Sequence, residues 1–175
     1  MHLNLKRTPG LYLAGFMGCG KTTVGPPLAK ELGWRFVDID AEIEKEQGKT
    51  ISEIFSQAGE PAFRELESRM IRRCVREIEA GEASVVALGG GALVTEGNWE
   101  LVERNGITLW LDCSLERIRK RLQGTDSRPL ARDPQYFERL YEARRQLYAR
   151  AHFRIDADVD DPAEVVQRIL RLPIF

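Results

Sequence analysis

The sequence has no hydrophobic run long enough to cross a membrane, and it has only three cysteines. None of its apolar runs approaches the roughly 18 residues of a transmembrane helix. Residues 1–6 carry no long apolar stretch and no small-residue cleavage site, so we expect no secretory signal and a cytoplasmic location. Cys19, Cys74 and Cys113 contain no Cys-x-x-Cys pair. Their spacing supports neither a zinc site nor a disulfide framework and predicts buried or half-buried thiols.

Neither sign of charge is in excess, because 26 basic residues stand against 27 acidic ones and the formal net charge is −1. This balance gives no bulk attraction to nucleic acid or to an anionic membrane, and we expect neither as a partner. Lysine is scarce, with six residues against twenty arginines. Arginine can hold a carboxylate or a phosphate at two points, but a genome that prefers arginine codons explains the excess equally well.

The pattern of apolar residues predicts one α/β domain over residues 1–175. A chain of 175 residues with 43% hydrophobic residues suits a single core. Segments of strand type alternate with segments of helix type, which is typical of a parallel sheet. The expected strands are residues 11–14, 35–38, 84–88, 107–111 and 153–156. The expected helices are residues 21–32, 41–47, 60–79, 97–104, 114–122, 136–149 and 162–170, and Thr50 with Glu53 forms a further helix start.

A phosphate-binding motif follows the first expected strand. Residues 15–22, GFMGCGKT, fit the pattern G-x-x-x-x-G-K-[ST] in full and open the next helix. Glycines let successive backbone N–H groups point at phosphate oxygens, and the helix adds its positive end. Lys21 would reach the β- and γ-phosphates, and the Thr22 hydroxyl would ligate Mg²⁺. The residues predicted to bind the nucleotide here are Gly18, Cys19, Gly20, Lys21, Thr22 and Thr23.

Two prolines interrupt the helix that follows this motif. Pro26 and Pro27 lack an N–H group and crowd the carbonyls of Thr22 and Thr23. A proline inside a helix costs about 3 kcal/mol. We therefore expect the helix to kink or to shift locally toward a looser turn, with the upstream loop intact.

Two aspartates follow the second expected strand. In an open parallel sheet the ligand lies beyond the carboxyl ends of the strands. Alternation along an extended segment would turn Asp38 and Asp40 to the same side, toward that crevice. Asp38 then fits a role toward Mg²⁺, and Asp40 fits a hydrogen-bond acceptor and base for a substrate hydroxyl. The alternative is that Asp40 caps the next helix.

Three glycines and several arginines complete the candidate site. Gly89, Gly90 and Gly91 follow the third expected strand and would let the backbone approach a small polar ligand, although a plain flexible turn also fits. Arg64, Arg128 and Arg144 taken singly are typical of solvated or salt-bridged surface residues. Residues 123–135 contain glycine, proline and charged residues with little apolar content, which predicts an exposed mobile loop.

Together these motifs resemble the shikimate kinase family. The matching stretches are GFMGCGKTT, FVDID, IEKEQGKTISEIF, GEPAFRELE, ALGGGAL, SRPL and RRQLY, in that family's order, and they cover residues 11–170. The resemblance implies a three-layer P-loop kinase fold, with a five-stranded parallel sheet of order 2-3-1-4-5 and helices on both faces. It also implies ATP-dependent phosphorylation of the shikimate 3-hydroxyl, giving shikimate 3-phosphate and ADP in aromatic amino acid (chorismate) biosynthesis. We expect a monomer whose cofactor is Mg²⁺.

The resemblance assigns roles to particular residues. Lys21, Asp40 and Arg128 match the catalytic residues, and Thr22 and Asp38 match the residues that hold the metal. The residues that match the shikimate site are Asp40, Arg64, Gly89, Gly90, Gly91 and Arg144.

The nucleotide contacts and the closing segments are implied in the same way. Arg128 matches the lid arginine that reaches the nucleotide phosphates, Arg121 matches an arginine that stacks on adenine, and Pro162 lies in the adenine loop. Residues 41–63 would close over shikimate, and residues 123–135 would close over ATP. The chain departs from the family at Pro26, where arginine is common, and at Gln146, where proline is usual.

Two rival functions remain open from the sequence. One is another small P-loop kinase that acts on gluconate or on a nucleoside monophosphate. The other is a nucleotide-dependent binding or regulatory module without turnover. The full set of Lys21, Asp40, Arg64 and Arg144 argues against the second, because a pure switch has no use for two arginines that hold a carboxylate.

Overall fold

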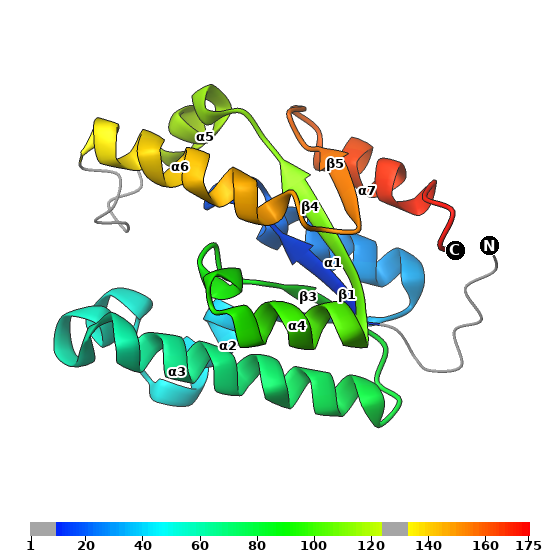
Figure 1. Ribbon diagram of the computed structural model, residues 1–175. Coiled ribbons are helices and arrows are strands. Elements are labelled where there is room, and N and C mark those ends of the chain that lie inside the picture. Colours follow the sequence, from blue (N-terminus) through cyan, green and yellow to red (C-terminus); the bar gives the residue numbers. More distant parts are fainter. Residues whose placement is uncertain (1–9, 124–132) are drawn as a thin grey trace.

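The computed structural model describes residues 10–123 and 133–175, which form a five-stranded parallel sheet with helices on both sides (Figure 1). The sheet order is β2-β3-β1-β4-β5, as the family resemblance predicted. The strands are β1 (Gly10–Ala14), β2 (Arg35–Asp38), β3 (Ser84–Ala87), β4 (Gly106–Asp112) and β5 (Phe153–Asp156). The helices are α1 (Lys21–Leu32), α2 (Ile39–Gln47), α3 (Ile51–Glu79), a 3-10 turn η1 (Ala92–Val94), α4 (Glu96–Asn105), α5 (Leu115–Leu122), α6 (Pro134–Tyr148) and α7 (Pro162–Leu170).

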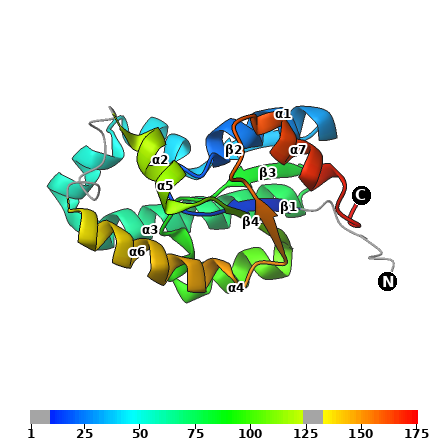
Figure 2. The ribbon, with the colours of Figure 1, turned by 90° about the horizontal axis from the view of Figure 1, so that it is seen from above.

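The helices form two layers around the sheet. Helices α1 and α7 cover one face, and α3, α4 and α6 cover the other (Figure 2). Because both faces are covered, the central strands are apolar along their whole length, and every residue of β1 and β3 is buried. The three-layer architecture is therefore confirmed. In the described part of the chain, no helix is both long and apolar enough to cross a membrane.

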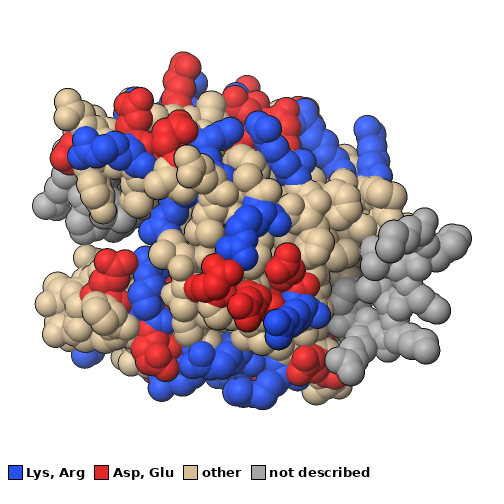
Figure 3. All heavy atoms as spheres, viewed as in Figure 1, with Lys and Arg blue, Asp and Glu red and all other residues tan. Residues whose placement is uncertain are grey.

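The outer surface mixes both signs of charge. On the face seen in Figure 3, acidic and basic side chains are interspersed. Many of these side chains form ion pairs. For example, Arg150 Nη2 lies 2.8 Å from Glu96 Oε1. The three thiols, Cys19, Cys74 and Cys113, are buried and free, as the sequence predicted.

The strand register brings the candidate residues to one edge of the sheet. Asp38, the last residue of β2, pairs with Ala87 of β3, and Ala87 also pairs with Leu13 of β1. The backbone N–H of Leu88 donates to Leu13 O at 3.0 Å and extends this pairing toward the glycines. The phosphate motif, the aspartates and the three glycines therefore leave the sheet at the same level.

Strand β2 ends earlier than an alternating pattern requires. Asp38 is the N-cap of α2, and its Oδ1 accepts from the N–H of Ala41 at 3.2 Å. Asp40 lies within the first helical turn, so it is neither the cap nor a residue of the extended strand. Both aspartates line one cavity, as predicted, but strand alternation is not the reason. The Asp38 carboxylate accepts from a helix N–H group and ends the strand, so Asp40 is placed by the first turn of α2.

Helix α1 continues through its two prolines. Residues 21–32 form one α-helix with Pro26 and Pro27 inside it, so the expected shift toward a looser turn is wrong. Both prolines are exposed, whereas Val24, Leu28 and Ala29 are buried against the sheet. Packing of this apolar side offsets the missing backbone hydrogen bonds.

The two helices expected around residues 50–79 join at a sharp bend. Thr50 forms the predicted capping box with Glu53. Gly59 interrupts α3 with φ 82° and ψ 170°, angles that a residue with a side chain rarely adopts. The part of α3 after this bend carries Arg64.

Candidate active site

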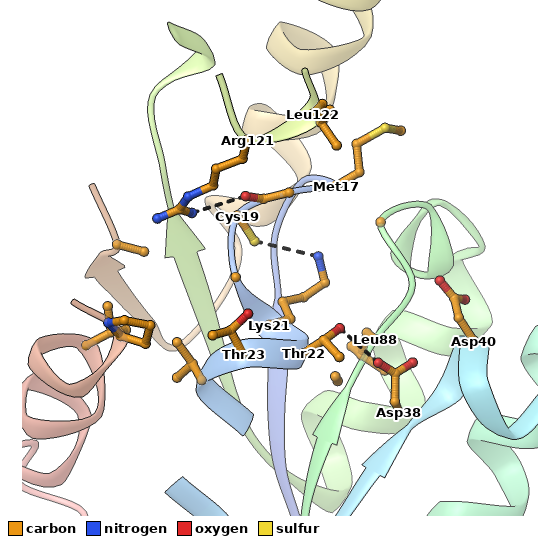
Figure 4. Close-up of a pocket in the computed structure, with 18 of the residues that line it drawn as sticks. Met17, Cys19, Lys21, Thr22, Thr23, Asp38, Asp40, Leu88, Arg121 and Leu122 are labelled. Carbon is orange, nitrogen blue, oxygen red and sulfur yellow. Dashed lines mark hydrogen bonds between the residues drawn. The ribbon is translucent and has the colours of Figure 1, made fainter. Parts of the chain in front are cut away.

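A cavity of about 430 Å³ opens at the carboxyl edge of the sheet (Figure 4). It is bounded by the phosphate motif, the end of β2, the glycine segment, the end of α5 and the connection from β5 to α7. The predicted residues that it brings together are Gly18, Cys19, Gly20, Lys21, Thr22, Thr23, Asp38, Asp40, Gly90, Arg121 and Pro162. Residues far apart in the sequence thus share one space large enough for a small ligand.

The phosphate loop is shaped for an anion. Gly18 and Gly20 have φ values of 77° and 104°, so the backbone can turn its N–H groups inward. Lys21 Nζ donates to Gly15 O at 2.6 Å and to Phe16 O at 3.0 Å. It also lies 3.6 Å from Cys19 Sγ (Figure 4). No acidic residue occupies the first turn of α1, so the positive end of the helix is not neutralised there.

A hydroxyl and a carboxylate meet beside this loop. Thr22 Oγ1 donates to Asp38 Oδ2 at 3.0 Å (Figure 4). Within residues 10–123 and 133–175, no group of three His, Cys, Asp or Glu residues forms a metal cage. Two hard oxygens next to a phosphate loop suit Mg²⁺, which is usually held by one or two side chains together with substrate phosphates and water.

The three glycines allow charged side chains to approach the backbone closely. A methyl group on Gly89 would lie 2.5 Å from Glu67 Oε1 and 2.8 Å from Asp40 Oδ1. A methyl group on Gly91 would overlap the guanidinium of Arg64. A side chain at either position would force these charged groups to move away from the backbone, a close approach that a plain flexible turn does not explain.

Arg64 is held by two glutamates on its own helix. Its Nη1 donates to Glu67 Oε2 at 2.8 Å, and its Nη2 donates to Glu60 Oε1 at 3.1 Å. The Glu67 side chain is fully buried, and its Oε1 has no hydrogen-bond partner among the described residues. Burial raises the pKa of Glu67, and the charge of Arg64 opposes that rise. Glu67 was not among the predicted site residues, although its i,i+3 spacing from Arg64 places the two side chains on one side of a helix.

Arg144 approaches the same cluster from α6. Its Nη1 is buried without a hydrogen-bond partner in the described part of the chain. Its charge acts on Glu67 in the same direction as that of Arg64. Two guanidinium groups from distant segments thus act on one buried carboxyl group, that of Glu67.

The burial of Glu67 predicts a pH-dependent difference in stability between the wild type and Glu67→Gln. Because the pKa of Glu67 is raised, the folded chain holds this proton more tightly than the unfolded chain. The free energy of unfolding of the wild type, relative to Glu67→Gln, should therefore fall as pH rises from the ordinary value of 4.5 through the raised pKa. Thermal unfolding of both proteins from about pH 4 to about pH 8 measures this difference.

Glu65→Gln is the matched control for this experiment. Glu65 lies two positions earlier on α3, and its side chain is 74% exposed. Its substitution should give no comparable dependence on pH. A wild type that gains stability over Glu67→Gln as pH rises would contradict the assigned direction.

The other side of the cavity is held by arginines of α5. Arg121 donates to Gly18 O and to Val159 O, both at 3.1 Å, and so links the phosphate loop to the connection before α7. Arg117 Nε donates to Asp158 Oδ1 at 2.7 Å and fixes the same connection. Arg128 and the central part of the predicted lid lie outside the described residues.

Known proteins identify the family. A family model described as shikimate kinase matches residues 17–172. A shikimate kinase of Persephonella marina is 45% identical over 161 residues, which cover 91% of this chain and 96% of that protein. The chain belongs to the shikimate kinase family.

The shikimate kinase relationship extends to solved structures. A shikimate kinase from Acinetobacter baumannii in complex with shikimate matches with a TM-score of 0.87 and 35% identity, covering 95% of this chain and 93% of that one. A gluconokinase from Sinorhizobium meliloti matches with a TM-score of 0.55 and 17% identity, which shows a shared fold alone. Pro26 and Gln146, where this shikimate kinase departs from the family pattern, are not among the described residues that line the cavity.

Proposed function

We propose that this chain transfers the γ-phosphoryl group of ATP to the 3-hydroxyl of shikimate, giving shikimate 3-phosphate and ADP in aromatic amino acid biosynthesis. The observation that carries the proposal is the pairing of two sites at one sheet edge. The phosphate loop lies on one side of Gly90, and the cluster of Arg64, Glu67 and Asp40 lies against Gly89 and Gly91. The relative from Acinetobacter baumannii, which was solved with shikimate, supports the choice of acceptor.

The nucleotide side neutralises charge on the moving group. Lys21 binds the β- and γ-phosphates after leaving the carbonyls of its own loop, and Arg128 reaches them from residues 123–135. Thr22 and Asp38 hold Mg²⁺, which when bound neutralises charge on the phosphate oxygens. Residues 18–23 surround the phosphates, while Arg121 and the loop at Pro162 hold the adenine.

The acceptor side orients one hydroxyl. Asp40 accepts the hydrogen bond of the 3-hydroxyl and takes its proton as the new P–O bond forms, while ADP leaves with the electrons of the broken bond. Arg64 and Arg144 hold the shikimate carboxylate, and residues 89–91 line the ring. Residues 41–63 close over shikimate and residues 123–135 close over ATP, which excludes water from the reaction. The enzyme works in the cytoplasm as a monomer.

Replacing Arg64 with alanine tests the carboxylate assignment. A charge-assisted hydrogen bond contributes about 1.5–3 kcal/mol, so Arg64→Ala should weaken shikimate binding roughly tenfold to a few hundredfold with ATP affinity nearly unchanged. Arg64→Lys should restore binding only in part, because a point charge cannot form two parallel bonds. Titration of both variants with shikimate and with ATP measures the effect. Arg69→Ala, an exposed arginine on the same helix, is the control.

The methyl ester of shikimate distinguishes the carboxylate from the rest of the substrate. The ester should be a poor substrate for the wild type. The Arg64→Ala substitution should lower activity with the ester only slightly further. Wild type and variant measured with acid and ester form a double-mutant cycle. An equal loss for ester and acid would show that Arg64 does not hold the carboxylate.

A panel of acceptors tests the reaction against its rivals. ADP formation is measured with shikimate, gluconate, AMP and CMP under the same conditions. Shikimate should be the strongly preferred acceptor. Preference for gluconate or for a nucleotide would assign the chain to another kinase activity, and ATP binding without transfer to any acceptor would favour a regulatory module.

A further inference from the structure

Tyr148 connects α6 to the middle of the glycine segment. Its hydroxyl donates a hydrogen bond to Gly90 O, and its side chain is almost completely buried. Burial raises the pKa of this phenol, so the hydroxyl stays protonated and can act only as a donor to the carbonyl. Tyr148 lies one helical turn after Arg144 on α6. One helix therefore carries both an arginine of the acceptor cluster and the residue that holds Gly90.

Gly90 also touches the phosphate loop. A methyl group on Gly90 would lie 3.4 Å from Met17 N and 3.8 Å from Gly15 O. Its neighbours contact the other substrate site, since Gly89 lies against Glu67 and Asp40, and Gly91 lies against Arg64. The backbone at Gly90 thus lies between the two sites, and the Tyr148 hydroxyl is hydrogen-bonded to its carbonyl oxygen.

Ionisable groups from both sites lie near Tyr148. Arg144, Arg64 and Glu67 belong to the acceptor cluster, and the Cys19 thiol belongs to the phosphate loop. Its ring packs at 6.3 Å from the ring of Trp110 in β4, the central layer of the fold. The ring is therefore held by the core, and the hydroxyl reaches Gly90 O from that side.

We infer that Tyr148 is a positioning residue whose hydrogen bond to Gly90 sets the separation between the acceptor cluster and the phosphate loop. This inference rests on the proposed function. The residue touches neither reacting atom. It acts on the transfer step, which depends steeply on the alignment of the acceptor oxygen with the phosphoryl group. A merely structural role would lower stability and leave the kinetics of the folded enzyme unchanged.

Tyr148→Phe removes the hydroxyl and keeps the packed ring. We expect kcat to fall about tenfold, while the KM values for ATP and for shikimate change less than about threefold. When the acceptor hydroxyl is out of line, water can attack the phosphoryl group instead. The ratio of ADP released to shikimate phosphate formed should therefore rise above its value in the wild type, and this ratio is a readout that lost stability alone does not move.

Tyr12→Phe is the matched control. Tyr12 is also fully buried, and its hydroxyl donates to Asn105 Oδ1 near the opposite edge of the sheet, where β1 and β4 begin. It should lose stability to a similar degree and keep both the wild-type kcat and the wild-type product ratio. Equal kinetics for Tyr148→Phe and Tyr12→Phe would overturn the inference.

Gly90→Ala tests the same contact from the other side. The added methyl would lie 3.4 Å from Met17 N, an ordinary van der Waals contact that keeps Gly90 from moving closer to the phosphate loop. We therefore expect kcat and the product ratio to change in the same direction as in Tyr148→Phe, by a smaller factor. This variant replaces Tyr148→Phe if the latter does not fold, and a wild-type product ratio in it would contradict the inference. Absence of shikimate phosphorylation by the wild type would instead refute the proposed function, so the two failures are distinguishable.

Discussion

Replacing Lys21 with alanine should lower kcat by a factor on the order of 10³ and leave the fold intact. The ammonium group contacts the carbonyls of Gly15 and Phe16 and the sulfur of Cys19, all within its own loop, and it lines the cavity. Its removal takes away the nearest side-chain charge that can stabilise the β- and γ-phosphates. The rate of shikimate-dependent ADP formation measures the loss, and thermal unfolding checks the fold.

Lys30→Ala is the control for this result. Lys30 lies in the last turn of the same helix and is exposed at the far end from the loop. Its removal should leave kcat within about twofold of the wild type. A Lys21→Ala protein with nearly normal kcat would contradict the kinase mechanism.

Asp40→Asn should lower kcat by about 10²-fold or more. The change keeps the size of the side chain and removes its charge and basicity. Asp40 lines the cavity, and its Oδ1 lies beside Gly89 together with the buried Glu67 carboxyl. It is therefore placed where an acceptor hydroxyl would need a proton acceptor. Steady-state kinetics with saturating shikimate and ATP measure the effect, with Glu42→Gln in the same helical turn as the control.

Asp38→Ala should behave differently. The Asp38 carboxylate accepts from the Thr22 hydroxyl and from the N–H of Ala41, so its loss affects the pair proposed to hold Mg²⁺ and the cap of α2. The variant should need more Mg²⁺ for half-maximal activity. If excess Mg²⁺ restored Asp40→Asn and failed to restore Asp38→Ala, the two aspartates would have the reverse roles.

Features that lie in consecutive residues were predictable from the sequence. The phosphate motif occupies eight consecutive positions, and its glycines, lysine and threonine each have a chemical reason. The buried strands are continuous apolar runs because helices cover both faces of the sheet. The cap at Thr50 uses local hydrogen bonds and was also predicted. The sheet order came from the family resemblance, since local patterns do not define which strands are neighbours.

Features that depend on tertiary contacts were missed or wrong. Asp38 and Asp40 are equally good helix caps by residue type, and only the packing of β2 against β3 decides where the strand ends. The uninterrupted α1 depends on burial of one helix side, which offsets the local preference of Pro26 and Pro27. The hydrogen bond from Tyr148 to Gly90 joins residues that are 58 positions apart, and no local pattern indicates it.

Identification of the product decides whether this chain phosphorylates shikimate. The purified chain is incubated with ATP, Mg²⁺ and shikimate, and the product is analysed by phosphorus–proton correlation NMR together with the amount of ADP released. We predict a single phosphate ester on the 3-hydroxyl of shikimate, formed in equal amount to ADP and only when shikimate is present. Unmodified shikimate beside released ADP and inorganic phosphate, or a phosphate on another hydroxyl, would contradict it.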